Sequence, residues 1–279
     1  MIELARFGGG QRLPDPERGD ALARLERTRA HALLQLGEPL FALEAATTAR
    51  GVLDEVGGVE DALLFVELAL LEARAASRLG QEPQALELLG ELLEALDDLE
   101  AGDARLLLRV EALRLRGELL SEQGEPAEAE RCCEEASERL RSREHERAYP
   151  ARWAELEATR GRILARRRPE VARLAFAAAR SRLEPALEGG RLDLLAPLFS
   201  LCRDELARLS TDPTAVAVRM GRVVYLARRA LGASEESASD LALSQWQELR
   251  ALPAIQRALG RASSELRESA LELERALAD

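Results

Sequence analysis

Apolar residues recur every three to four positions along almost the whole chain, beginning near Glu17. This spacing predicts amphipathic α-helices, and no stretch shows the strict alternation of a half-buried strand. Two predicted helices are apolar on nearly every side, over residues 62–66 and 106–110. Helices of that kind are expected in inner positions with neighbours on both sides. The pattern therefore predicts an all-α protein.

Prolines divide this helical sequence at nearly equal intervals of 43 or 44 residues, with a last interval of 40: Pro39, Pro83, Pro126, Pro169, Pro213 and Pro253. Proline is tolerated in the first turn of a helix and disfavours helical geometry at the preceding residue. Each proline therefore predicts the start of the second helix of a hairpin. The first helices are predicted over residues 17–36, 59–79, 103–123, 148–167, 191–209 and 234–250, and the second helices over 39–56, 83–98, 126–145, 169–187, 213–231 and 253–277.

A fixed period of this size indicates stacked hairpins, because one hairpin cannot bury its apolar face alone. We expect an α-solenoid of about six antiparallel helical hairpins, wound into a right-handed superhelix, in a single domain over residues 17–279. Residues 1–16 contain three consecutive glycines and two prolines, so we expect a flexible N-terminal tail there. The charged last helix, residues 263–278, is expected to cap the stack with a solvated face.

A turn motif recurs in the first three hairpins, and it contains Gly37, Gly80 and Gly124, each closely followed by proline. Each glycine comes seven residues after a small residue and five before an alanine. The triples are Ala30, Gly37 and Ala42; Ala73, Gly80 and Ala85; and Gly117, Gly124 and Ala129. In this pattern the chain resembles the tetratricopeptide repeat (TPR) family. Its period exceeds the usual length of about 34 residues, and resembles long-repeat variants attached to bacterial signalling ATPases, kinases and transcription activators.

Two further features depart from the family pattern. In the fourth hairpin, Gly161 is one residue out of register. In the first three hairpins a charged residue directly precedes the small one, where the family usually has a large apolar residue: Arg29, Glu72 and Arg116.

In the TPR family the first helices line a concave face that holds a peptide of a partner protein. The resemblance therefore implies partner-binding residues at matching positions: Arg24, Arg27, His31 and Gln35 in the first hairpin, Glu67, Arg74, Ser77 and Arg78 in the second, Glu111, Arg114, Glu118, Ser121 and Glu122 in the third, and Arg162 and Arg166 in the fourth. The alternative interpretation is that these are ordinary solvated residues of amphipathic helices.

The formal net charge of −11 is unevenly distributed. Residues 1–138 contain 14 Arg and 30 acids, whereas residues 139–182 contain 13 Arg and 5 acids. This basic zone, which also includes Arg167 and Arg168, can clamp carboxylates or phosphates in bidentate fashion. Nearby glutamates or the acidic N-terminal half can instead neutralise it. All 39 basic residues are Arg, a bias that we attribute to a GC-rich bacterial genome.

Several classes of function are disfavoured by the sequence. An acidic chain with 3% aromatic residues is a poor candidate for nucleic-acid binding. No uncharged run is long enough to span a membrane, and the N-terminus lacks the apolar segment of a secretory signal. The cysteines, Cys132, Cys133 and Cys202, are expected to be free, buried thiols in a reducing cytoplasm. No metal-ligand spacing, cofactor motif or catalytic motif is present, so we expect no metal, no cofactor and no enzyme activity.

We therefore expect a cytoplasmic scaffold or adaptor in bacterial signalling or regulation, which binds a segment of another protein on the concave face. Its partner can also be a domain of its own parent system or a second copy of the chain. The alternative hypothesis is a regulatory module that senses a small effector within a larger signalling ATPase, kinase or transcription activator. A pocket between first helices, with arginine side chains converging on it, would favour that alternative.

Overall fold

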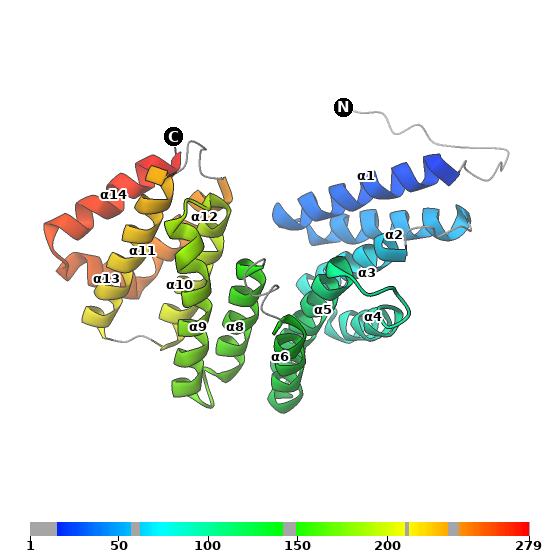
Figure 1. Ribbon diagram of the computed structural model, residues 1–279, viewed down its shortest axis with the longest axis horizontal. Helices are drawn as coiled ribbons and strands as arrows, with labels where there is room; N and C mark the ends of the chain where they lie inside the picture. The colour runs from blue at the N-terminus through cyan, green and yellow to red at the C-terminus, as the bar shows by residue number, and fades with distance from the viewer. Residues whose placement is uncertain (1–15, 57–61, 142–148, 210–211, 234–239, 279) are drawn as a thin grey trace. The chain divides into compact units, whose positions relative to one another are not determined.

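The computed structural model describes residues 16–56, 62–141, 149–209, 212–233 and 240–278. Every regular element in these residues is a helix (Figure 1). The helices pack into two compact units, residues 1–115 and 116–279. We call them the first and second units and describe each by itself. Residues 1–15 of the predicted tail lie outside the described residues, and Pro16 already begins the first helix. The single domain predicted over residues 17–279, like the superhelical winding, stays a prediction.

The first unit begins with two helical hairpins. Its helices are α1 (Pro16–Gln35), α2 (Pro39–Val56), α3 (Ala62–Arg78), α4 (Glu82–Ala95) and the N-terminal part of α5 (Asp103–Glu122), which continues into the second unit. α1 packs on α2, α3 packs on both of them, and α4 packs on α3. The core of the first hairpin and α3 consists of small and aliphatic side chains, among them Ala30, Ala42 and Leu68. Small residues at these crossings allow the helices to approach closely.

The second unit contains the other helices in two rows. They are α6 (Pro126–Leu140), α8 (Pro150–Leu164), α9 (Pro169–Glu188), the short 3-10 helix η1 (Leu192–Leu194), α10 (Leu195–Leu209), α11 (Pro213–Ala233), α12 (Asp240–Ala251), α13 (Pro253–Arg261) and α14 (Ser264–Ala278). First helices α8, α10 and α12 contact one another in order, as do second helices α9, α11 and α13. Larger side chains fill this core, and the rings of Phe199 and Trp246 lie 5.3 Å apart.

The recurring turn glycines end their helices in the left-handed region. Gly37, Gly80 and Gly124 have φ angles of 79°, 73° and 87°. At the first turn the Gly37 N–H donates to Leu34 and the next N–H donates to Leu33, and the other two turns repeat this pair of bonds. This is the Schellman arrangement, which satisfies the last carbonyls of a helix and favours glycine. The turns and proline starts of TPR-like helical hairpins are therefore confirmed.

The small residues before these turns lie where two helices cross. Ala30 and Ala73 are completely buried. A Cβ atom on Gly117 would lie 3.1 Å from the Ala129 carbonyl oxygen. In the fourth hairpin a Cβ atom on Gly161 would lie 2.8 Å from the ring of Phe176. Gly161 therefore occupies the crossing position of its hairpin, although the turn that follows it differs from the other three.

The prediction of one continuous helix over residues 253–277 is wrong. These residues are divided between α13 and α14. Ala262 between them has an extended conformation, with ψ of 166°, and Ser263 accepts a hydrogen bond at its Oγ from the Leu266 N–H at 3.3 Å. A serine in this position caps the start of a new helix, so the chain begins α14 here. Some parts of the predicted helices lie outside the described residues, namely 59–61, 142–145, 148 and 234–239. Arg141 is described and lies in the turn just after α6.

Candidate binding surface on the first helices

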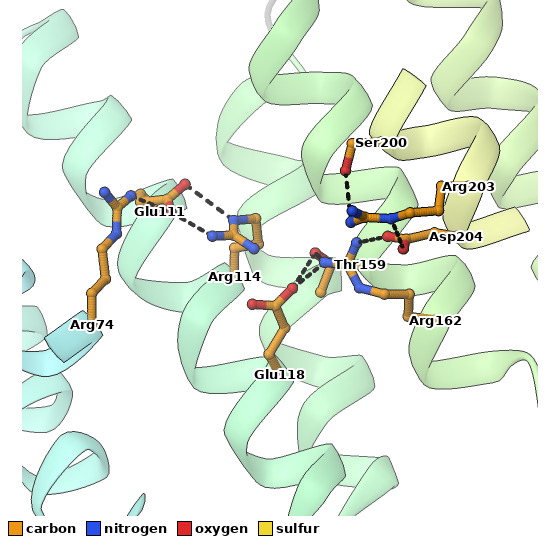
Figure 2. Close-up of polar contacts among 9 residues, drawn as sticks. All are labelled: Arg74, Glu111, Arg114, Glu118, Thr159, Arg162, Ser200, Arg203 and Asp204. Atoms are coloured by element: carbon orange, nitrogen blue, oxygen red, sulfur yellow. Dashed lines mark hydrogen bonds and ion pairs between the residues drawn. The ribbon is translucent and has the colours of Figure 1, made fainter. Parts of the chain in front are cut away.

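In the first unit, charged residues on successive first helices pair with one another. Arg27 of α1 pairs with Glu67 of α3, and Arg74 of α3 pairs with Glu111 of α5. Figure 2 shows Arg74 and Arg114 pointing toward Glu111, which is buried. Arg114 donates through Nε to Glu111 at 3.1 Å and through Nη2 at 2.6 Å. Two guanidinium groups therefore compensate one desolvated carboxylate, as a buried charge requires.

In the second unit, Arg162 of α8 joins three first helices (Figure 2). It pairs with Glu118 of α5 and donates to Asp204 of α10 at 2.6 Å. Thr159 lies between them, accepting from Arg162 at 2.7 Å and donating to Glu118 at 3.1 Å. On the next first helix, Arg203 of α10 pairs with Glu248 of α12. Pairing between neighbouring first helices is thus repeated along each unit.

Six of the predicted partner-binding residues belong to these contacts between helices: Arg27, Glu67, Arg74, Glu111, Glu118 and Arg162. Arg114 pairs with Glu111 of its own helix. Arg78 also bridges two helices, because it donates to the Leu34 carbonyl. These side chains orient their neighbours, so their charge is compensated within the protein. Their role in partner binding stays a prediction.

The other predicted residues differ in surroundings. Arg24 is exposed and pairs with Asp20 at 2.8 Å, one turn earlier in α1. His31 and Gln35 are exposed, and Ser77 is half-buried. Arg168, at the start of α9, pairs with Glu130 of α6.

Arg166 and Arg167 line a hollow in the second unit, which we call the basic hollow. Its volume is about 710 Å³, and it is lined by Glu118, Ser121, Glu122, Gly124, Pro126, Arg162, Ile163, Arg166, Arg167 and Arg208. Arg166, Arg167 and Arg208 are exposed, and none of them has an ion pair within the described residues. The lining carries four arginines and two glutamates. Arg162 already pairs with Glu118 and Asp204. Arg166, Arg167 and Arg208 are the other cations of the lining, against the single carboxylate of Glu122, so the remaining lining carries an excess of positive charge for an anionic ligand.

Sequence reasoning missed Arg208, Asp204 and Thr159. The signal was present for Arg208, since it lies 42 residues after Arg166, close to one repeat. The fifth hairpin lacks the Gly-containing turn motif from which the repeat positions are counted. The contacts of Asp204 and Thr159 can be recognised only when it is known which helices are neighbours, because their partners lie 41 or 42 residues away along the chain.

The cysteines do not form a reactive or metal-binding centre. Cys133 and Cys202 are buried, and complete burial raises the pKa of the Cys202 thiol to about 12. Burial also raises the pKa of the half-buried Cys132. A thiol with a raised pKa is a poor nucleophile. Across the described residues, no three His, Cys, Asp or Glu side chains come together as metal ligands. Nor does any helix in these residues have the length and apolar character needed to cross a membrane.

Comparisons with known proteins add one structural likeness. No protein-family model matches the chain, and no curated protein matches it. Among solved structures, one that is similar is described as the "TPR2AB-domain:pHSP90-complex of yeast Sti1". It has 15% sequence identity and a TM-score of 0.36, and the match covers 93% of this chain and 99% of that chain. The TPR-like fold is assigned from the hairpins, turns and crossings of the chain itself.

Proposed function

We propose that this chain is a protein-interaction scaffold that binds an acidic segment of a partner protein in the basic hollow. The observation that carries the proposal is the contrast among arginines. Arg27, Arg74 and Arg162 on the first helices pair with acids of neighbouring helices. In contrast, Arg166, Arg167 and Arg208 line one hollow, and none of them has an ion pair within the described residues. Cations left uncompensated beside a concavity provide a site for anions.

The chemistry of the hollow favours carboxylates or phosphates on a flexible segment. Guanidinium groups recognise both in a planar, bidentate manner. The hollow is open and lined by charged side chains, with Ile163 as a buried apolar neighbour. Binding should therefore depend on charge and weaken as salt screens the exposed arginines. We propose no catalytic role and no cofactor. We propose a bacterial, cytoplasmic protein because of the all-arginine composition and the free thiols, and a role in signalling because of the resemblance to long-repeat TPR variants.

The test uses a short fluorescent peptide rich in Glu and Asp, titrated with the full chain and followed by fluorescence anisotropy. Reversing Arg166, Arg167 and Arg208 to Glu should weaken binding at least about tenfold, because each charged hydrogen bond contributes about 1.5–3 kcal/mol. The matched control reverses Arg257, Arg261 and Arg267, three exposed arginines of α13 and α14. It has the same net charge and should bind the peptide like the unchanged protein.

Equal losses in the two triple variants would show that binding follows net charge alone, and would overturn the hollow as the site. Failure of the unchanged chain to prefer the acidic peptide over a neutral peptide of equal length would overturn the proposal itself. Circular dichroism of each variant checks that helicity is kept, since all six side chains are exposed.

A small anionic effector is a second candidate occupant, because the arginines converge on a hollow between α5, α8 and α10. Its volume lies within the range of small-molecule sites, about 300–1,000 Å³. A thermal-shift series with dicarboxylates and phosphorylated metabolites distinguishes the two. A shift with one metabolite, abolished in the Arg166/Arg167/Arg208 variant, would favour the effector if the acidic peptide does not bind.

A further inference from the structure

One side of α1 carries an uninterrupted exposed row at alternating spacings of four and three residues. We call it the outer seam: Arg18, Leu22, Leu25, Arg29 and Ala32, followed by Leu36 in the turn just after α1. Leu22 is 43% exposed and Leu25 is 64% exposed. Isolated exposed leucines are common, but this spacing is that of a seam between two packed helices.

Equivalent positions in the second hairpin are covered by a helix. Counted from the small residues Ala30 and Ala73, Leu22 and Leu25 correspond to Phe65 and Leu68. Leu68 is completely buried beneath the first hairpin. Arg50 of α2 lies 4.6 Å from the centre of the Phe65 ring and also pairs with Glu72, the counterpart of Arg29.

The fourth hairpin repeats this burial. Counted from Gly161, the same two positions are Trp153 and Leu156 of α8, and they are 5% and 1% exposed. α6, the preceding second helix in the second unit, packs against α8. The outer seam is thus the face by which a hairpin stacks on the one before it, and on α1 no helix of the described residues covers it.

We propose that the outer seam binds the outer seam of a second copy of this chain. The two α1 helices would lie antiparallel about a two-fold axis, which is the symmetry of most dimers. The inference is independent of the basic hollow, since α1 belongs to the first unit and the hollow belongs to the second.

Charge complementarity fixes the register of this pairing. In this pairing the two antiparallel α1 helices cross at residue 27 of each copy. Leu22 of one copy then lies beside Ala32 of the other, and Leu25 lies beside Arg29. Each Arg29 then lies next to Glu26 of the other helix. This contact would replace the pair that the exposed Arg29 makes with its own, half-buried Glu26 at 3.1 Å. In a competing register Leu22 of one copy lies beside Leu25 of the other. That register also places Arg29 of one copy beside Arg18 of the other, and the repulsion between these like charges disfavours it.

The residues that flank the seam support the same occupant. Ala21, Thr28 and Gln35, which border the seam on one side, carry no charge, so no like charges meet there.

The first test measures the mass of the full chain by sedimentation velocity across a concentration series. The unchanged chain should form dimers, and L25E should raise the dimer dissociation constant at least about 30-fold, as loss of a central apolar contact does. L174E is the matched control, because Leu174 of α9 is 70% exposed and lies outside the seam. It should dimerise like the unchanged chain. Both variants should keep their helicity and melting temperature.

The second test exchanges charges in the pair that fixes the register. R29E should weaken the dimer, because the introduced carboxylate would meet Glu26 of the second copy, and the double variant E26R/R29E should restore it. A monomer at every concentration would overturn the proposal, as would growth into larger species, equal effects of L25E and L174E, or a double variant no better than R29E.

Discussion

At the scale of single residues, Gly161 shows how a small side chain determines the distance between two helices. An ideal Cβ atom there would lie 2.8–2.9 Å from three atoms of the Phe176 ring. Phe176 is completely buried in the core of the second unit, so its ring cannot move into solvent. The crossing of α8 and α9 therefore requires glycine at this position.

Replacing Gly161 with Ala should lower the free energy of unfolding by about 1–3 kcal/mol, the usual cost of overpacking a core. Gly221→Ala is the control, because its Cβ atom would have its nearest neighbour at 4.0 Å and would sit within helix α11. That change should be neutral or stabilising by up to about 1 kcal/mol through helix propensity. Urea unfolding followed by circular dichroism measures both. A Gly161 variant as stable as the control would contradict the crossing.

Glu157 of α8 predicts a specific pH dependence. The residue is buried, its nearest arginine contact is 4.0 Å away, at Arg160, and burial raises its pKa despite the arginines Arg160 and Arg182. A carboxyl with a raised folded pKa binds protons more tightly in the folded state, so its contribution to stability falls as the pH rises through that pKa. Glu157→Gln should therefore gain stability relative to the unchanged protein as the pH rises from below the ordinary carboxyl pKa toward neutrality.

Asp193 supplies a control of opposite sign. Its hydrogen bonds from Arg191, at 2.6 and 2.7 Å, lower its pKa. The contribution of such a group is present above its unfolded pKa and is lost as the pH falls through the folded one. Asp193→Asn should thus be destabilising near neutrality and indistinguishable at acidic pH, with a small effect because the pair is exposed. Parallel pH profiles for the Glu157 and Asp193 variants would contradict this assignment.

At the scale of elements, two glycines of one hairpin differ in backbone conformation but not in the space available to a side chain. Gly80 ends the turn after α3 with φ of 73°, whereas Gly90 lies within helix α4. A Cβ atom at either position would meet nothing within 4 Å. Gly80→Ala should be destabilising by about 1–2 kcal/mol because of the left-handed φ, and Gly90→Ala should stabilise by up to about 1 kcal/mol. Chemical unfolding of the two variants should show shifts of opposite sign.

The hairpin elements could be predicted from the sequence because their signals are local. Each turn glycine and each following proline acts on its own few residues, so α2, α6, α9, α11 and α13 begin at the prolines expected of them. The predicted helix over residues 253–277 continued across the break before α14, because the helical pattern of apolar residues is continuous on both sides of Ser263. The same limit applies to Gly161, where the spacing differs by one residue yet the crossing is kept.

The candidate site could be predicted only in part, since pairing depends on which helices become neighbours. The sequence singled out Arg162 and Arg166 alike. Stacking then places Arg162 between Glu118 and Asp204 and leaves Arg166 exposed at the hollow. Leu25 and Leu68 likewise occupy equivalent repeat positions, and only the presence of a covering helix makes one exposed and the other buried.

At the scale of the whole molecule, the repeated stacking makes stability a local property. In a solenoid each hairpin contacts its neighbours, so stability is approximately a sum of hairpin and interface contributions. Within the second unit α8 contacts α6, α9 and α10, whereas α14 contacts α11 and α12. Destabilisation at one crossing should therefore weaken with distance along the stack.

Amide hydrogen exchange of the Gly161→Ala variant tests this locality. Exchange should accelerate most in α8 and α9, less in α10, and least in α1 and α2 of the first unit, because local opening reports the free energy of the region that opens. Gly80→Ala should reverse the order, with the largest acceleration in α3 and α4. Equal acceleration of all helices by either variant would mean that the two units unfold as one cooperative body. The opposed patterns expected of the two variants exclude a general loss of stability as the cause, since both changes are single glycine replacements of comparable expected cost.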